Sequence, residues 1–336
     1  MTRNSLITAA LAITSILSLC GSAEPIPGSI PAPDDGFPGP CQLSSRETDA
    51  RHYSLTARVR LVFVWISRAG VGAGRIAWSE GENGTRGLAL LIGSDPARAP
   101  MKINRWGYIV ERASGSRAEL VGVMTEAEEQ SIAQARASVS RSNATHSFKS
   151  IRSLIEERTA YSSVHYMRLP EDFTYREVEA LLQRVPKEGG RVRHLFMPDG
   201  AEPGFLFAVR SLVDESVDAF RSAGAPGIAP AALRRYEFAG AAFEMRRQST
   251  RIVRELTING KEFRQLLESE FEARNLSNGQ LSHFSITYGT QEPATGIPVR
   301  IVYRPRWWFE AEMQLESDSS ASHAVNRGAS WESGTR

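Results

Sequence analysis

Hairpin turn signals recur along this chain, and they constrain its fold more than any other feature of the sequence. Four short segments rich in Asn, Gly and Ser each separate two stretches of strand-like composition: Glu82-Asn83-Gly84, Ser114-Gly115-Ser116, Asn259-Gly260 and Asn278-Gly279. Asn-Gly favours the tight turns that join neighbouring antiparallel strands, because both residues adopt positive φ readily. The sequence therefore predicts a sheet built mainly from antiparallel hairpins.

Strand-like stretches lie on both sides of these turns. Residues 53–68 are rich in Val, Leu, Phe and Trp, and the first two turns join 75–80 to 86–92 and 104–113 to 117–124. The closing stretch has the clearest period of two, because apolar residues at 307, 309, 311, 313 and 315 alternate with mainly polar ones. Such alternation predicts a strand with one apolar face and one mainly polar face.

Three capping boxes, in which a Ser or Thr is followed three residues later by an acid, begin at Thr125, Thr174 and Ser211. They predict helices that run from Thr125 towards residue 139, from Thr174 to about 185, and from Ser211 to about 223. Strand-like runs at 161–169 and 191–197 flank the second helix, so this β-α-β order suggests one parallel crossover. We expect an α+β fold, predominantly antiparallel sheet as a meander, a sandwich or a partial barrel, with about three helices in the middle of the chain.

The N-terminus has the layout of a secretory signal peptide. Arg3 supplies a positive charge, residues 6–19 form an uncharged apolar run, and small residues follow up to Ala23. Residues 17–21 also resemble a bacterial lipobox, in which Cys20 is lipidated and becomes the first mature residue, although Leu19 stands where a small residue is usual. We expect an exported protein that is periplasmic, extracellular or anchored to the cell envelope through Cys20.

Composition divides the remainder of the chain. Six prolines between residues 25 and 40 predict an extended, disordered linker over 24–48, after a signal peptide over 1–23. Residues 224–230 separate an expected α+β domain, 49–223, from a β-rich C-terminal region, 231–316, that we expect to pack on it. The tail, 317–336, has little to bury and is predicted to be disordered.

Charge and motifs exclude several classes of function. Lys and Arg total 40 against 38 Asp and Glu, so net charge gives no support for a nucleic-acid partner. The chain has two Cys and lacks the P-loop, G-x-S-x-G, H-E-x-x-H and C-x-x-C patterns. The glycines in 70–74 precede strand-like residues and not the helix that a dinucleotide requires, so we interpret them as a wide hairpin loop. We expect no cofactor, no metal and no nucleic acid.

The first candidate binding segment is 95–108. Two prolines predict a loop, in which hydrogen-bond donors lie beside flat aromatic rings at Lys102, Asn104, Arg105, Trp106 and Tyr108. This mixture suits stacking against a sugar or holding an anionic group. Alternatively, the same residues fasten a long loop to the sheet, with Trp106 as its buried anchor.

The second candidate is the closing strand. Adjacent Trp307 and Trp308 must point to opposite faces of an extended chain, so one of them is left outside a single core. An exposed Trp308 beside Arg304 and Arg306 would make a binding hot spot. A second packed layer would instead bury both rings.

These features favour a non-catalytic binding or structural module of the cell envelope. Its partner would be an envelope protein or a glycan, with membrane contact only through a lipid on Cys20. The alternative is a secreted hydrolase with a dispersed site, in which a Ser, His165 or His194 and a carboxylate converge in the fold. His165 and His194 are the candidates because both lie in the strands that flank the second predicted helix.

Overall fold

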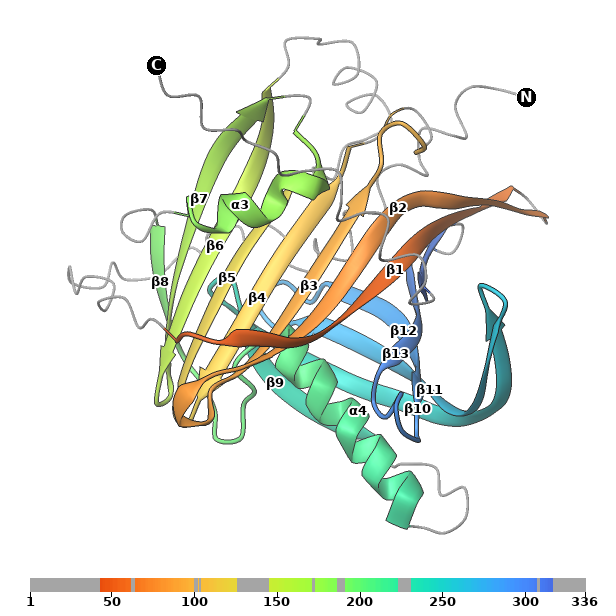
Figure 1. The fold of residues 1–336 in the computed structure, drawn as a ribbon. Helices are drawn as coiled ribbons and strands as arrows, with labels where there is room; N and C mark the ends of the chain where they lie inside the picture. Colours follow the sequence, from red (N-terminus) through yellow and green to blue (C-terminus); the bar gives the residue numbers. More distant parts are fainter. Residues whose placement is uncertain are drawn as a thin grey trace, which may run out of the picture.

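The computed structural model in Figure 1 describes residues 43–61, 64–99, 102, 104–125, 145–170, 173–185, 191–222, 231–306 and 309–316. Within them, fourteen strands form one sheet in which every neighbouring pair is antiparallel. The sheet curls into a nearly closed barrel (Figure 1), so the predicted class, mainly antiparallel sheet, is confirmed, and a barrel is the one present of the arrangements that the sequence left open. The predicted signal peptide, most of the linker and the tail lie outside the described residues.

The strands form two meanders that meet in the middle of the sheet. The first contains β1 (Arg46–Leu61), β2 (Val64–Glu80), β3 (Arg86–Ser94), β4 (Trp106–Ser114), β5 (Arg117–Thr125), β6 (Thr145–Glu156), β7 (Thr159–Pro170) and β8 (Arg191–Phe196). The second contains β9 (Ala232–Phe238), β10 (Ala241–Ile258), β11 (Lys261–Asn275), β12 (Leu281–Gly289), β13 (Pro298–Arg306) and β14 (Phe309–Leu315). Pairing of β1 with β14 joins them, and β8 and β9 are the two outer strands.

All four predicted hairpin turns are confirmed. The short 3-10 helix η3 (Glu82–Gly84) joins β2 to β3, and the other three turns join β4 to β5, β10 to β11 and β11 to β12. Asn83 and Asn259 both have positive φ, 57° and 49°, as the Asn-Gly turns require. These turns are local structures, so the sequence alone identifies them.

Two predictions about the first strands are wrong. Residues 53–68 do not form one strand, because β1 ends at Leu61 and β2 returns beside it from Val64. The glycines in 70–74 do not form a loop but lie within β2. At Gly72 a Cβ atom would lie 2.1 Å from the carbonyl oxygen of Gly93, so a larger residue would push β2 away from β3. Glycine here serves close strand packing.

The predicted parallel crossover is also wrong. β7 and β8 pair antiparallel, with Tyr161 opposite His194. The chain between these strands holds η5 (Tyr175–Glu177) and the short helix α3 (Val178–Leu182), which lies across β4 and β5 before the chain returns beside β7 (Figure 1). A connection that contains a helix can therefore join antiparallel strands here.

The described residues contain two α-helices, α3 and α4 (Phe205–Ser222), instead of about three. Of the helix predicted from Thr125, only Thr125 itself is described, and it ends β5. The third predicted helix is α4, but it begins at Phe205, six residues before Ser211. Neither α-helix in the described part of the chain is long and apolar enough to cross a membrane.

The two helices lie against opposite faces of the sheet. α3 packs on an outer cluster formed by Trp106, Tyr108, Val121, Val123 and Phe148. α4 lies on the inner face, in the main core, where side chains of β1 to β6 meet those of β9 to β14. Alternating residues of β4 and β5 thus supply both clusters, because successive side chains of a strand point to opposite faces.

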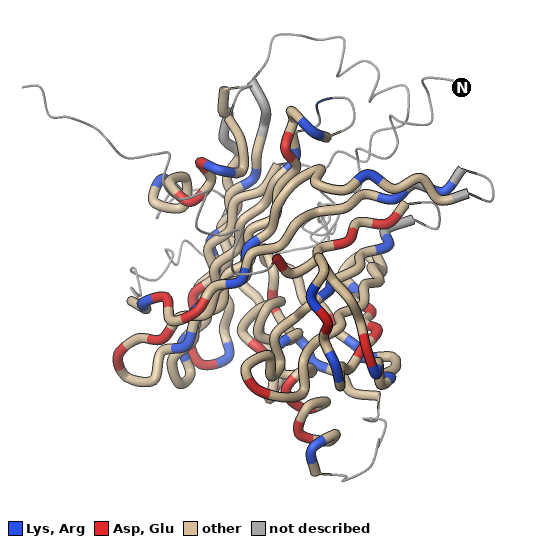
Figure 2. The backbone as a smooth tube through the Cα atoms, turned by 45° about the vertical axis from the view of Figure 1, so that its right-hand side comes forward, with Lys and Arg blue, Asp and Glu red and all other residues tan. Residues whose placement is uncertain are grey.

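Charged residues of both signs are interspersed along the described strands (Figure 2). Many form ion pairs between neighbouring strands. On β14 the expected polar face is present but buried, with Glu310 5% and Glu312 1% exposed. Arg58 Nη2 lies 2.7 Å from Glu312, and Arg304 Nε donates to Glu310 at 2.8 Å. The buried carboxylates of this face are thus compensated by ion pairs with neighbouring arginines.

Candidate functional site

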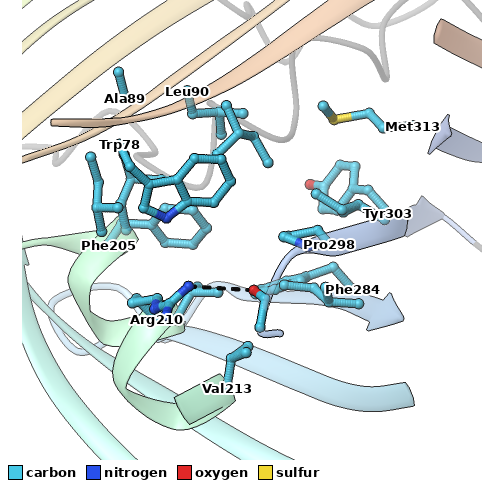
Figure 3. Close-up of a pocket in the computed structure, with 17 residues that line it drawn as sticks. Trp78, Ala89, Leu90, Phe205, Arg210, Val213, Phe284, Pro298, Tyr303 and Met313 are labelled. Atoms are coloured by element: carbon cyan, nitrogen blue, oxygen red, sulfur yellow. Dashed lines mark hydrogen bonds between the residues drawn. The ribbon is translucent and has the colours of Figure 1, made fainter. Parts of the chain in front are cut away.

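A cavity of about 100 Å³ lies inside the barrel between α4 and the sheet (Figure 3). Its walls come from both meanders and from the helix, and include Trp78, Leu90, Phe205, Phe284, Tyr303 and Met313. Among the seventeen described residues that line it, Arg210 alone carries a charge. The cavity is therefore an apolar space with a single cation at its wall.

The strand and helix periods build these walls. Leu206, Val209 and Val213 lie three and four residues apart on α4, so they form one stripe that faces the cavity. Ile76 and Trp78 alternate on β2 and meet this stripe from the opposite side. Hydrophobic periodicity marks these residues as core, and nothing in the sequence shows that a space remains between them.

Arg210 holds its position through two contacts. Its Nε donates to Asp214 Oδ2 at 2.8 Å, one helical turn away, and its Nη1 donates to the carbonyl oxygen of Gly296 at 3.4 Å. The Arg210 side chain is 34% exposed, so it stands at the boundary between the cavity and solvent. Burial raises the pKa of Asp214, although the neighbouring charge of Arg210 acts in the opposite direction.

Glu111 of β4 anchors the start of α4. Its carboxylate oxygens accept hydrogen bonds from the backbone N–H groups of Leu206, at 3.0 Å, and Phe207, at 3.1 Å. A negative charge at a helix N-terminus is favourable, since the first N–H groups have no partner within the helix. Glu111 is 1% exposed, and burial raises its pKa to about 7 in spite of these bonds. Glu111 therefore takes the place of the cap expected at Ser211.

Arg247 of β10 anchors the middle of α4. This side chain is 1% exposed, and its Nη1 donates to the carbonyl oxygen of Leu212 and to Ser216 Oγ, both at 2.6 Å. Its Nη2 donates to Glu215 Oε1 at 3.1 Å, while Arg234 of β9 reaches the other oxygen of Glu215 at 2.7 Å. The inner wall of the barrel thus holds α4 in place over the cavity.

A second buried carboxylate, Glu237 of β9, lies where the two ends of the sheet approach one another. Its Oε1 accepts hydrogen bonds from Ser162 Oγ of β7 at 2.7 Å and from the Gly240 N–H at 2.5 Å. Ser162 also contacts Ser153 of β6 at 2.9 Å. Burial raises the pKa of Glu237. These bonds join β9 to β7 and so help to close the barrel.

A wider hollow of about 270 Å³ lies on the outside, at the end of β8. Phe196 forms part of its wall and is 67% exposed, with the guanidinium of Arg158 4.5 Å from its ring centre. Arg235 and Leu276 line the other side. The hollow is larger than the inner cavity, but its exposed walls make it a surface groove, so the inner cavity is the better candidate for enclosing a ligand.

The structure places the first predicted binding segment mostly against the sheet. Trp106 is 3% exposed and packs on Phe148 and Phe173, with ring centres 5.9 and 5.3 Å away. Tyr108 is buried as well, and burial raises its pKa. Trp106 therefore occupies the position that the anchoring interpretation gives it.

The polar members of this segment differ in exposure. Asn104 Nδ2 donates to the carbonyl oxygen of Phe173 at 2.6 Å, and the Arg105 N–H donates to Ser94 Oγ at 2.8 Å. Both side chains are partly exposed, and Lys102 is exposed. A binding role for this loop stays a prediction, and these three residues are the ones that a partner can reach.

The second predicted surface lies at the turn between β13 and β14. Arg304 is exposed and paired with Glu310, and Arg306 ends β13 opposite Phe309. Trp308, like Cys20, falls outside the described residues, so its binding role stays a prediction.

His165 and His194 lie on the neighbouring strands β7 and β8 but are not opposite each other. His194 pairs with Tyr161, and their rings are 4.9 Å apart, whereas the pairing of the two strands ends at Val164, before His165. In the part of the chain that the structure describes, no group of three or more His, Cys, Asp or Glu side chains could hold a metal ion.

Comparisons with known proteins add little to this geometry. No family model matches the chain, and no curated protein matches its sequence. The crystal structure of a β-barrel-like protein of the domain of unknown function DUF1849, from Brucella abortus, is similar with a TM-score of 0.34 and 9% sequence identity. The alignment covers 80% of this chain and 95% of that one. At this TM-score the likeness gives no support for a shared function or site.

Proposed function

We propose that this chain is an exported, non-catalytic binding protein whose barrel holds an apolar group of its ligand in the cavity beneath α4. The apolar lining, interrupted by one charge, supports binding and not chemistry. The signal-peptide layout of residues 1–23 supports export to the periplasm, the extracellular space or the envelope. The exposed parts of the two predicted surfaces, around Lys102 and Arg304, are then available for an envelope protein or a glycan.

The size of the cavity limits what can enter it. A dry apolar cavity of about 150 Å³ takes up benzene, so about 100 Å³ has room for roughly four carbon atoms. Each methylene group transferred from water into such a space contributes about 0.8 kcal/mol to the binding free energy, which is roughly a fourfold gain in affinity. Longer chains would extend towards solvent past Arg210.

Titration with 1-alkanols from ethanol to octanol, followed by NMR shifts of α4 amide groups, tests this function. We expect saturable binding whose affinity rises about fourfold for each methylene up to about butanol and then levels off, because the cavity is full. Val209→Phe places a larger side chain in the cavity and should abolish binding, whereas Ser222→Phe, at the exposed end of the same helix, should not. Absence of saturation in the wild-type protein, or equal binding by both variants, would contradict the proposal.

Export is tested separately by mass analysis of the mature N-terminus from fractionated cells. An acylated Cys20 indicates an anchored protein, and a free Glu24 indicates ordinary cleavage after Ala23. Full-length protein with Met1 intact in the cytosol would refute the export part of the proposal.

A further inference from the structure

Arg210 has hydrogen-bonding capacity that its contacts leave unused. A guanidinium has five N–H donors, and the contacts with Asp214 and Gly296 occupy two of them, the second at the long distance of 3.4 Å. About three donors, including both on Nη2, thus have no hydrogen-bond partner among the described residues, and the side chain is 34% exposed. Figure 3 shows the guanidinium beside the apolar walls, with its hydrogen bond to Gly296 drawn as a dashed line.

A second cation lies near the same helix. Arg86, at the start of β3, is exposed, and its Cζ lies 5.9 Å from the ring centre of Phe207 on α4. Its charge acts together with that of Arg210 on Asp214, since both oppose the rise in pKa that burial causes at that carboxyl. Two guanidinium groups and a second carboxylate, Asp218, thus act on Asp214 beside the apolar cavity.

We infer that the ligand of this cavity is a single-chain amphiphile with an anionic head, whose hydrocarbon end fills the cavity and whose carboxylate or phosphate binds Arg210. This inference rests on the proposed function of the cavity. A planar guanidinium binds a carboxylate or phosphate through two parallel N–H bonds, which a neutral hydroxyl group cannot form. Arg86 adds attraction for the same negative charge.

Asp214 competes with such a head group. Its side chain is 45% exposed, so it can turn to water when a ligand carboxylate replaces it on Arg210. The partial burial that raises its pKa also makes its charged form less favourable at this place. Removing the charge of Asp214 should therefore strengthen the binding of an anionic head and leave the binding of a neutral one unchanged.

Three ligands with the same six-carbon chain test the inference: hexanoate, hexyl phosphate and 1-hexanol, titrated into the full mature chain at pH 8 and low salt. We expect both anions to bind the wild-type protein at least tenfold more tightly than 1-hexanol. Hexanoate and hexyl phosphate also distinguish a carboxylate from a phosphate as the preferred head. Added salt should weaken the binding of the two anions and leave the binding of 1-hexanol unchanged.

Variants on α4 assign the effect to one side chain. Arg210→Met should reduce the affinity for hexanoate to that for 1-hexanol, and Asp214→Asn should raise it severalfold. Arg221→Met is the matched control, because Arg221 also lies on α4 and donates to Thr290, at 3.1 Å, but does not line the cavity. This control should retain the preference for anions.

The outcomes separate this inference from the function on which it rests. If 1-hexanol binds as tightly as hexanoate, or if Arg210→Met keeps the preference for anions, the inference is wrong while the apolar cavity still functions. If none of the three ligands shows saturable binding to the wild-type protein, the proposed function fails and the inference with it.

Discussion

Replacing Glu111 with Gln should change how the stability of this protein depends on pH. Glu111 is buried at the N-terminus of α4, and its pKa in the folded state is about 7, compared with about 4.5 when it is exposed to water. Because the folded state holds the proton more tightly, this group stabilises the fold most below pH 4.5. That stabilisation is lost as the pH rises from 4.5 through 7, where the folded protein must ionise a buried carboxyl.

The size of the effect follows from the difference in pKa. A shift of about 2.5 units, at about 1.4 kcal/mol per unit, corresponds to about 3 kcal/mol of unfolding free energy. Other groups with shifted pKa values, such as Glu237 and Glu312, remain in both proteins. The difference between wild type and variant therefore isolates Glu111, apart from its coupling to Glu237.

Urea unfolding at a series of pH values from 4.5 to 8.5 measures this difference. The unfolding free energy of the wild-type protein should fall relative to that of Glu111→Gln by about 3 kcal/mol across the series. Glu82→Gln, in the exposed turn between β2 and β3, is the control and should follow the wild-type curve. Parallel curves for the wild type and Glu111→Gln would show that Glu111 does not titrate differently in the folded protein, and would refute the reasoning.

Two further substitutions test how α4 and α3 are held. Arg247→Met removes a buried guanidinium that binds Leu212, Ser216 and Glu215, and should lower the unfolding free energy by about 3–5 kcal/mol in urea; a loss no larger than that of Arg221→Met would be inconsistent with this anchoring role. Trp106→Ala should cost about 3–5 kcal/mol, because Trp106 is buried beneath α3, whereas Lys102→Ala should change stability by less than about 0.5 kcal/mol. Equal, small losses for both would place Trp106 at the surface.

The hairpin turns illustrate what local sequence can predict. At Asn259-Gly260 the two central residues must both adopt positive φ, and the structure shows 49° and 78°. Asn and Gly adopt such angles readily whatever surrounds them, so the turn can be predicted without knowledge of the fold. The same holds for the alternation along β14, where side chains change face at every residue.

The start of α4 illustrates where local sequence fails. The Ser211 box suggests a cap, but Ser211 Oγ in fact accepts a hydrogen bond from Arg234 Nε at 3.0 Å. The acceptor for the first N–H groups of α4 is Glu111, which precedes Leu206 by 95 residues. A cap supplied from a distant strand leaves no local sequence pattern. The capping box therefore predicted the helix correctly but placed its start six residues too late.

The antiparallel pairing of β7 with β8 could not be predicted from local sequence either. A strand, a helix and a second strand in succession usually form a parallel crossover, yet α3 folds onto the outer face of β4 and β5, and β8 returns antiparallel to β7. Which face a short helix covers depends on where an apolar surface is free. In this protein Trp106 and Phe148 provide that surface.

The sequence by itself determined the turns, several of the strand positions, the antiparallel class of the sheet and the presence of α4, because each depends on residues close together in the chain. Only the tertiary structure determined that a cavity remains in the core and which residues line it. Trp78 and Leu90 meet Phe284 and Tyr303 there because the sheet curls round α4, and Arg210 is distinguished from the other arginines only by standing at that cavity. Curling of a sheet brings together residues some 200 positions apart, and no local pattern records which of them will leave a space.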